Sequence, residues 1–174
     1  MASILASANP TQKPQDLIPN DWKALGISVL ALDFDGVLAP HGETTPLPAM
    51  HNWLKNCLTH FPPEQIFILS NRPSPARIQY FNRTFPGIRF ISGVQKKPYP
   101  DGLAQIIKIK QVAAHEVMLV DDRLLTGGLA ACLAGTQVTY IRQPYIALAK
   151  RPIKELFFII LRSLEKRFIK RFSQ

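Results

Sequence analysis

Short apolar runs recur along the chain and indicate buried β-strands. The strongest runs span Val29–Leu32, Ile66–Leu69, Val117–Val120 and Val138–Ile141, and a weaker one spans Ile88–Ile91. A strand with one solvent-exposed face alternates apolar and polar residues. The strongest of these runs are instead apolar almost throughout and are bounded by turn residues. Such runs are typical of a parallel sheet that helices cover on both faces. We therefore predict a central parallel sheet of about five strands.

Amphipathic segments between the runs predict the covering helices. These segments span Pro48–Thr59, Ser74–Phe85, Asp101–Gln111, Leu124–Ala134 and Pro152–Arg171. Pro48, Pro75 and Pro152 support three of the helix starts, because the first helical turn tolerates a missing N–H. The alternation of strands and helices predicts an α/β fold of three layers.

Length and composition fit one globular domain with two tails. The chain has 174 residues, of which 47% are apolar and 19% charged, enough for a single core. We assign residues 16–150 to the domain, 1–15 to a flexible tail and 151–174 to a basic amphipathic helix. The first segment lacks the basic start and apolar region of a signal peptide. Cys57 and Cys132 have no metal-ligand spacing and are expected to be buried thiols, so the sequence favours a cytoplasmic protein.

Polar residues follow the predicted strands. In chain order they are Asp33 and Asp35, Ser70 and Asn71, Lys97, and Asp121 and Asp122. The carboxyl ends of parallel strands share one edge of a sheet, and ligands bind at that edge. We expect carboxylates, a hydroxyl and an ammonium group to meet there in one crevice.

This set of groups suits phosphoryl transfer. A carboxylate can attack phosphorus and form an aspartyl-phosphate, which divides one difficult displacement into two easier ones. A hard divalent cation held by carboxylate oxygens reduces the repulsion between this nucleophile and the anionic substrate. A lysine and a serine hydroxyl can stabilise charge on the phosphoryl oxygens.

The same residues resemble the motifs of the haloacid dehalogenase superfamily. Asp33-Phe34-Asp35-Gly36-Val37-Leu38 resembles the first motif, Ser70-Asn71 the second, Lys97-Pro98 the third and Val120-Asp121-Asp122 the fourth. The resemblance implies a Rossmann-like domain, phosphatase activity and Mg²⁺ as the cofactor. The chain departs from the pattern at Val37, where threonine is usual, and at Gly127, where the fourth motif usually has a second acidic residue.

The resemblance also implies a role for each residue. Asp33 would be the nucleophile and a metal ligand, and Asp35 the general acid and base and a ligand through its backbone carbonyl. The remaining ligand would be Asp122, with neighbouring Asp121 left open as the alternative. Ser70, Asn71 and Lys97 would hold the phosphoryl group.

The chain leaves no room for a large cap domain. Gly36–Pro48 and Ile91–Asp101 are long enough only for loops, so the site should be open to a large or surface-bound substrate. The chain is similar to the YqeG-like branch of the superfamily, which includes phosphatidylglycerophosphate phosphatases. The residues that carry this similarity are Lys97-Pro98, Asp122-Arg123-Leu124-Leu125-Thr126, Val138-Thr139-Tyr140-Ile141 with Pro144, and Arg162-Ser163-Leu164-Glu165-Lys166. The branch usually has Gly-Asp-Gln and Thr-Asp where this chain has Asp121-Asp122-Arg123 and Thr126-Gly127.

The basic charge is concentrated at the C-terminal end. Residues 150–174 carry a net charge of +6 out of +9 for the whole chain. An apolar stripe runs through the same segment at Ile153, Phe157, Ile160, Leu164, Phe168 and Phe172. Such a helix at residues 152–171 can lie in an anionic lipid interface, and the alternative is a helix docked on the domain with a solvated basic face.

We therefore predict a Mg²⁺-dependent phosphatase that acts on a membrane phospholipid phosphate such as phosphatidylglycerophosphate. It would be cytoplasmic or peripheral at the inner face of a membrane. The alternatives are a phosphatase of a soluble sugar phosphate or of a nucleic-acid end, and a non-catalytic binding module. Specific nucleic-acid binding is not expected, because the phenylalanines of the tail lie on its apolar face and not among its basic residues.

Overall fold

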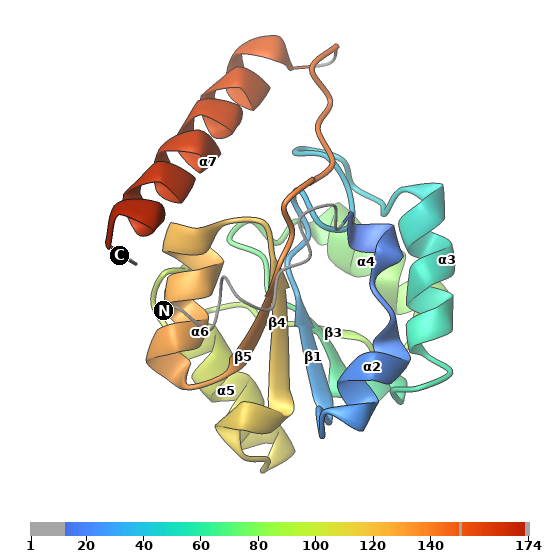
Figure 1. Cartoon of the computed structure of the whole chain (residues 1–174). Coiled ribbons are helices and arrows are strands. Elements are labelled where there is room, and N and C mark those ends of the chain that lie inside the picture. Colours follow the sequence, from blue (N-terminus) through green and yellow to red (C-terminus); the bar gives the residue numbers. More distant parts are fainter. Residues whose placement is uncertain (1–12, 150, 173–174) are drawn as a thin grey trace.

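The predicted sheet is present, with five strands that all run parallel. The computed structural model describes residues 13–149 and 151–172. The strands are β1 (Val29–Leu32), β2 (Ile66–Ile68), β3 (Arg89–Phe90), β4 (Val117–Asp121) and β5 (Gln137–Tyr140). Their order across the sheet is β3-β2-β1-β4-β5 (Figure 1). This arrangement confirms the predicted α/β fold with a central parallel sheet.

The continuously apolar runs form the central strands, whereas the run at Val138–Ile141, which Thr139 interrupts, forms the edge strand β5. The central strands β1, β2 and β4 are buried along their whole length, which explains their continuous apolar sequence. Strand β3 lies at one edge, is only two residues long and leaves Arg89 exposed. The weak run at this position therefore reflects an edge strand with one open side.

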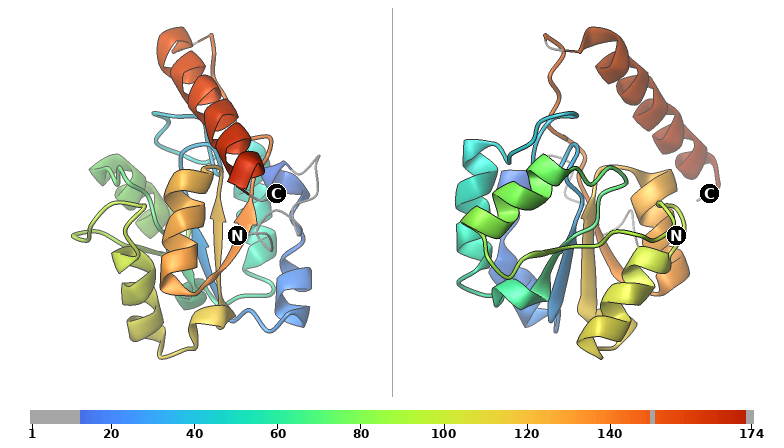
Figure 2. Two further views of the ribbon diagram at one scale, coloured as in Figure 1. Left: turned by 60° about the vertical axis from the view of Figure 1, so that its left-hand side comes forward. Right: turned by 180° about the vertical axis from the view of Figure 1, so that it is seen from behind.

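Helices cover both faces of the sheet, as Figures 1 and 2 show. One face carries α2 (Pro19–Ala24), α3 (Pro48–Cys57) and α4 (Pro75–Thr84), and the other carries α5 (Asp101–Lys110) and α6 (Leu129–Ala134). Alternate residues of β1 serve the two cores: Leu30 and Leu32 pack in the first, Val29 and Ala31 in the second. The domain is thus three layers with two apolar cores.

Within the described residues, three 3₁₀ turns and one π-helical turn complete the domain. The 3₁₀ turns are η1 (Pro14–Asp16), η2 (Pro63–Gln65) and η3 (Ala114–Glu116). The helix predicted at Leu124–Ala134 is divided into the π-helical turn η4 (Leu124–Gly128) and α6. Helix α2 is too short to give a periodic signal and was not predicted.

Cys57 is buried, but Cys132 is exposed on the outer side of α6. The expectation of two buried thiols was therefore wrong for Cys132.

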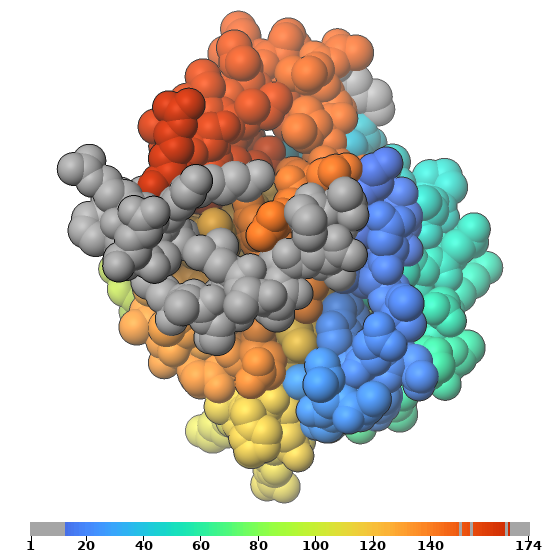
Figure 3. Space-filling view, viewed as in Figure 1, coloured from blue at the N-terminus to red at the C-terminus, as the bar shows by residue number. Residues whose placement is uncertain are grey.

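The last helix, α7 (Pro152–Phe172), lies on neither face of the sheet. It follows an extended segment after β5 and stands over the carboxyl edge of the strands (Figures 1 and 2). In space-filling view it lies at the top of the molecule (Figure 3). None of the described helices is long and apolar enough to cross a membrane. The predicted tail at residues 1–15 falls mostly outside the described residues, and its flexibility stays a prediction.

Candidate active site

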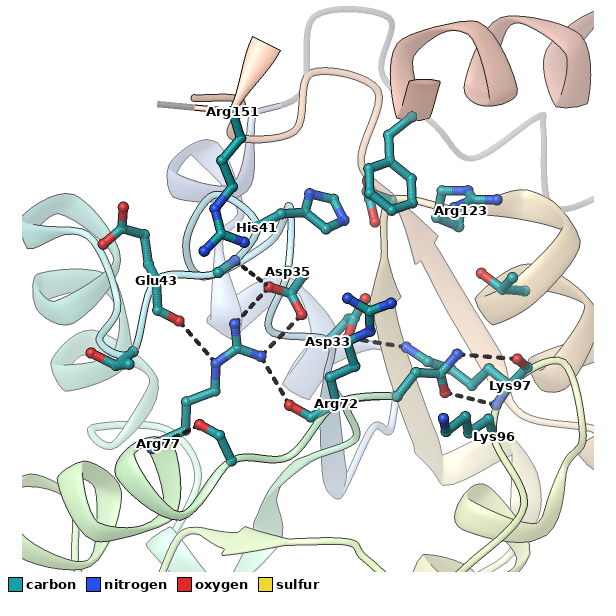
Figure 4. A pocket seen from close by; sticks show the side chains of 17 residues that line it. Asp33, Asp35, His41, Glu43, Arg72, Arg77, Lys96, Lys97, Arg123 and Arg151 are labelled. Carbon is teal, nitrogen blue, oxygen red and sulfur yellow. Dashed lines mark hydrogen bonds and ion pairs between the residues drawn. The ribbon is translucent and has the colours of Figure 1, made fainter. Parts of the chain in front are cut away.

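The carboxyl edge of the sheet holds a cavity of about 540 Å³. Five of the predicted site residues line it: Asp33, Asp35, Asn71, Lys97 and Asp122 (Figure 4). Segments between β1 and α3, after β2, before α5 and after β4 supply these side chains. Only loops occupy the places where a large cap would be inserted, and the cavity is covered on one side by α7.

Lys97 connects two of the carboxylates. Its ammonium Nζ lies 3.2 Å from Asp33 Oδ1 and donates to Asp121 Oδ2 at 2.5 Å. Asp33 follows β1 directly, and its Oδ1 also accepts a hydrogen bond from the N–H of Phe34 at 2.8 Å. The second oxygen of Asp33 accepts no hydrogen bond from the described residues and is available for chemistry.

Asn71 and Ser70 lie differently from the predicted phosphate-binding pair. The Asn71 amide donates to the backbone carbonyl of Lys97 at 3.1 Å and accepts from its N–H at 2.8 Å. Asn71 therefore positions the main chain of Lys97. Ser70 is buried at the end of β2 and accepts from the N–H of Arg72 at 3.2 Å. It is not among the described residues that line the cavity, so a phosphate contact for either residue stays a prediction.

Asp35 is held by Arg77, a residue that sequence reasoning missed. Arg77 Nη2 and Nη1 donate to the two carboxylate oxygens at 2.6 and 3.0 Å, and its Nε donates to the carbonyl of Glu43 at 2.9 Å. The guanidinium also stacks on the ring of Phe34, 3.9 Å from the centroid. Arg77 is almost fully buried on α4, forty-two residues after Asp35, and no local motif links the two positions.

The fourth motif places two acidic residues in different surroundings. Both oxygens of Asp121 are engaged, Oδ2 by Lys97 and Oδ1 by the N–H of Arg123 at 2.8 Å. Asp122 is instead paired with Arg162 of α7, whose Nε lies 2.7 Å from Oδ2. A carboxylate oxygen from each of Asp33, Asp121 and Asp122 lies within 4.8 Å of the others. This is a set of hard oxygen donors, the kind that Mg²⁺ binds.

The electrostatics of this cluster also fit a divalent cation. Burial is the largest cause that raises the pKa of Asp33 to about 8; Lys97 lowers it, and the carboxylates of Asp121, Asp122 and Asp35 raise it further. Burial likewise raises the pKa of Asp122 to about 6, although Arg162 opposes the shift. For Lys97, burial lowers the pKa but the carboxylates of Asp121 and Asp33 outweigh it, so the pKa is raised. Negative charge is crowded here, and a bound cation would relieve it.

His41 and Phe158 form the far wall of the cavity. Their rings stack at 4.1 Å between centroids with an interplanar angle of 10°. Burial is the main cause that lowers the pKa of His41 to about 4; Asp35 raises it and Arg162 lowers it. His41 was assigned no role from sequence, because a lone histidine in a loop carries no signal. Phe158 was placed on an apolar helix face, and only the docking of α7 brings it here.

Comparisons with solved structures agree with this fold. A protein of Corynebacterium glutamicum described as uncharacterized is 20% identical with a TM-score of 0.50, covering 79% of this chain and 96% of that chain. A haloacid dehalogenase-like family hydrolase from Streptococcus pneumoniae is 12% identical with a TM-score of 0.53, covering 72% and 89%. These likenesses establish the fold alone. A comparison with curated proteins gives no significant match.

The sequence itself matches a family over most of the domain. Residues 10–146, far more than half of the chain, match the family described as mitochondrial PGP phosphatase. This match spans β1 to β5 and all of the motif residues at the carboxyl edge. The chain therefore belongs to the family of mitochondrial PGP phosphatases and is a phosphatase with the haloacid dehalogenase fold.

Proposed function

We propose that this protein is a Mg²⁺-dependent phosphomonoester hydrolase that works through an aspartyl-phosphate on Asp33. The observation that carries the proposal is the placement of Asp33 at the end of β1, with Lys97 Nζ 3.2 Å from one carboxylate oxygen. The other oxygen is available to attack phosphorus. Lys97 is buried and lies where negative charge develops on the phosphoryl group, so it can stabilise that charge.

Asp35 is proposed as the general acid and base of both steps. In the first step Asp33 forms a bond to phosphorus, the ester bond breaks, and protonated Asp35 gives its proton to the leaving oxygen. In the second step water attacks the aspartyl-phosphate, Asp35 takes one proton from that water, and inorganic phosphate leaves. Arg77 orients the Asp35 carboxylate through its two hydrogen bonds.

The proposed metal ligands are the carboxylates of Asp33 and Asp122 and the backbone carbonyl of Asp35. When bound, Mg²⁺ would neutralise charge between the nucleophile and the phosphoryl oxygens. Between the two candidates of the fourth motif we choose Asp122, because both oxygens of Asp121 already serve Lys97 and the backbone of Arg123. Asp121 is then a positioning residue for Lys97.

The proposed substrate is a phospholipid monoester such as phosphatidylglycerophosphate. Family membership, the short loops at the two places where a large cap would be inserted, and the basic C-terminal segment all support it. Arg72 and Arg151 also line the cavity and suit the second, diester phosphate of such a lipid. Helix α7 carries exposed apolar residues that suit a lipid interface, so we propose peripheral attachment at an anionic membrane surface in preference to a purely cytoplasmic location.

A substrate panel with purified wild type and Asp33→Asn tests the catalytic proposal. Phosphate release is measured from phosphatidylglycerophosphate in vesicles, from soluble sugar phosphates and from a phosphorylated DNA end. We expect the wild type to prefer the lipid and Asp33→Asn to lose turnover on every substrate while keeping its fold. Turnover by a well-folded Asp33→Asn would refute covalent catalysis by Asp33, and a preference for a sugar phosphate or a DNA end would replace the lipid with that substrate.

Vesicle binding tests the membrane part of the proposal. Changing Arg167, Lys170 and Arg171 to Glu should weaken sedimentation with anionic vesicles and slow hydrolysis of the lipid. Turnover of a soluble aryl phosphate should hardly change. Added salt should have the same effect as the substitutions, because it screens exposed charges over about 8 Å at physiological ionic strength. Equal vesicle binding by both proteins at low salt would rule out electrostatic recruitment by α7.

A further inference from the structure

Helix α7 contacts the domain through buried charged residues. Arg162 is buried and pairs with Asp122, with its Nε and Nη2 at 2.7 and 2.5 Å from Oδ2. One turn later Glu165, also buried, accepts from Arg123 Nε at 2.9 Å and from the N–H of Leu124 at 3.2 Å. Polar contacts therefore hold much of this helix against the mouth of the site.

The apolar side of α7 faces outward. Five large apolar residues on it are between 51% and 84% exposed: Ile153, Leu156, Phe157, Ile160 and Leu164. A helix that is a permanent part of a domain normally buries its apolar stripe and leaves its charges in water. Here these five residues are exposed while Glu155, Arg162 and Glu165 are buried, so the apolar contacts of α7 are limited to half-buried residues such as Phe158, which stacks on His41.

The docked arrangement also leaves buried polar atoms without partners. Glu155 is fully buried, and neither of its carboxylate oxygens accepts a hydrogen bond from the described residues. Among the described residues, His41 Nδ1 lies 3.8 Å from Glu155 Oε1 and likewise has no hydrogen-bond partner. Arg162 Nη1 also lacks a hydrogen-bond partner among the described residues. Buried polar atoms without partners oppose docking, so these atoms favour release of α7 from the closed position.

Charge balance shows what could release it. Asp33, Asp121 and Asp122 place three carboxylates in the site, and Lys97 with Arg162 brings two positive charges. A divalent cation in place of the Arg162 guanidinium would balance the three carboxylates in full. Two cations cannot share the Asp122 carboxylate at close range without repelling each other.

We propose that α7 is a latch in which Arg162 and Mg²⁺ exclude each other at Asp122. In the closed state Arg162 neutralises Asp122 and α7 covers one side of the cavity. Mg²⁺ binding displaces Arg162, and α7 then leaves the mouth of the site. None of the latch contacts involves the outer face of α7. The helix can therefore open while its outer face stays on a lipid surface. This inference rests on the proposed metal site.

Mg²⁺ titration calorimetry of the full chain without lipid tests the latch. A latch that is closed in about nine molecules of ten lowers the apparent affinity about tenfold, so Arg162→Gln should bind Mg²⁺ about tenfold more tightly than wild type. Glu165→Gln, which does not touch Asp122, should also tighten binding by loosening α7. The matched control is Arg83→Gln on α4, an exposed arginine far along the chain from the latch residues, which should leave the affinity unchanged.

A distance measurement gives a second readout that does not depend on activity. Spin labels are attached to exposed Cys132 on α6 and to Ser163→Cys on the exposed side of α7, while Cys57 is buried. Mg²⁺ should lengthen and broaden the distance distribution of the otherwise wild-type chain. Arg162→Gln should show the broad distribution before Mg²⁺ is added, with its binding to anionic vesicles unchanged.

The outcomes separate the latch from the proposed function. If Asp33→Asn and Asp122→Ala bind Mg²⁺ as tightly as the wild type does, the proposed metal site fails and the latch fails with it. If they do weaken it, but folded Arg162→Gln and Glu165→Gln bind Mg²⁺ no more tightly than wild type, only the latch is overturned. Weaker Mg²⁺ binding or a higher KM in Arg162→Gln would instead make Arg162 a support of the metal or the substrate. Should Arg162→Gln not fold, Glu165→Gln and the label distances of the otherwise wild-type chain decide the question.

Discussion

Gly127 stands where a side chain would collide with the carboxylate of Asp121. A Cβ at this position would lie 2.1 Å from Asp121 Cγ and 2.2 Å from its Oδ2. The same Oδ2 accepts the 2.5 Å hydrogen bond from Lys97. Gly127→Ala should therefore push Asp121 away and weaken the support of Lys97, which is the proposed phosphate-binding ammonium group.

The cost of Gly127→Ala can be estimated from the two effects that act together. Forcing an extra methyl group into a packed site costs about 1 to 3 kcal/mol, and removing one partner of a buried ion pair costs about 3 to 5 kcal/mol. Asp121 is displaced and not deleted, and alanine gains up to about 1 kcal/mol over glycine within a helical turn. We expect a net loss of about 2 to 4 kcal/mol in the free energy of unfolding, together with a lower turnover number.

The neighbouring glycine provides a matched control. A Cβ on Gly128 would have its nearest contact, with Leu124 Cδ2, at 3.7 Å, an ordinary van der Waals distance. Gly128→Ala should keep activity and hold or slightly raise stability. Chemical denaturation and phosphate release for the two alanine variants compare the positions directly. The steric reasoning is refuted if Gly127→Ala is as stable and as active as Gly128→Ala.

A double substitution extends the same test. The branch that this chain resembles usually has glycine at the position of Asp121 and aspartate at the position of Gly127. Since the Asp121 carboxylate occupies the space beside Gly127, Asp121→Gly combined with Gly127→Asp should supply a carboxylate to Lys97 from the other position. The double variant should be more active than either single variant. If the two losses simply add, the positions do not replace each other.

Three further predictions concern other parts of the molecule. In the presence of a chelator the melting temperature should fall as the pH rises from about 6 to 8, because the raised pKa of Asp33 lets the folded protein keep a proton that the unfolded chain has lost. The fall should be smaller in Asp33→Asn, where Asp122, with its pKa raised to about 6, still contributes, and an undiminished fall there would exclude Asp33 as a cause. Arg77→Gln should lower kcat about tenfold or more with little change in KM, because Asp35 loses its two hydrogen bonds. Arg77→Lys should not restore kcat, since an ammonium group cannot form the same bidentate pair of hydrogen bonds. Full activity of either variant would contradict the positioning role of Arg77. A thiol reagent should modify Cys132 at once but Cys57 only after unfolding, because Cys57 is buried and burial raises its pKa; mass spectrometry of the native protein would refute this if Cys57 reacted first.

Local patterns in the sequence were enough for the sheet and its polar edge. The apolar runs of β1, β2 and β4 predicted buried parallel strands, and parallel strands of one sheet bring their carboxyl ends to the same edge. Asp33, Lys97 and Asp122 line one cavity, as expected from their places directly after a strand or in a short loop after one, while their roles there stay predictions. The sequence could not separate Asp121 from Asp122, since neighbouring residues differ only in where the backbone directs them.

The partners of these residues were decided by tertiary structure alone. Arg77 reaches Asp35 from α4, and Arg162 reaches Asp122 from α7, across forty-two and forty positions of the chain. No periodicity or motif links residues at such separations, because their contact depends on how whole helices pack. The apolar stripe of α7 could be predicted from spacing, but not its direction. A helix normally turns such a stripe toward the domain, and here the ion pairs of Arg162 and Glu165 turn it outward.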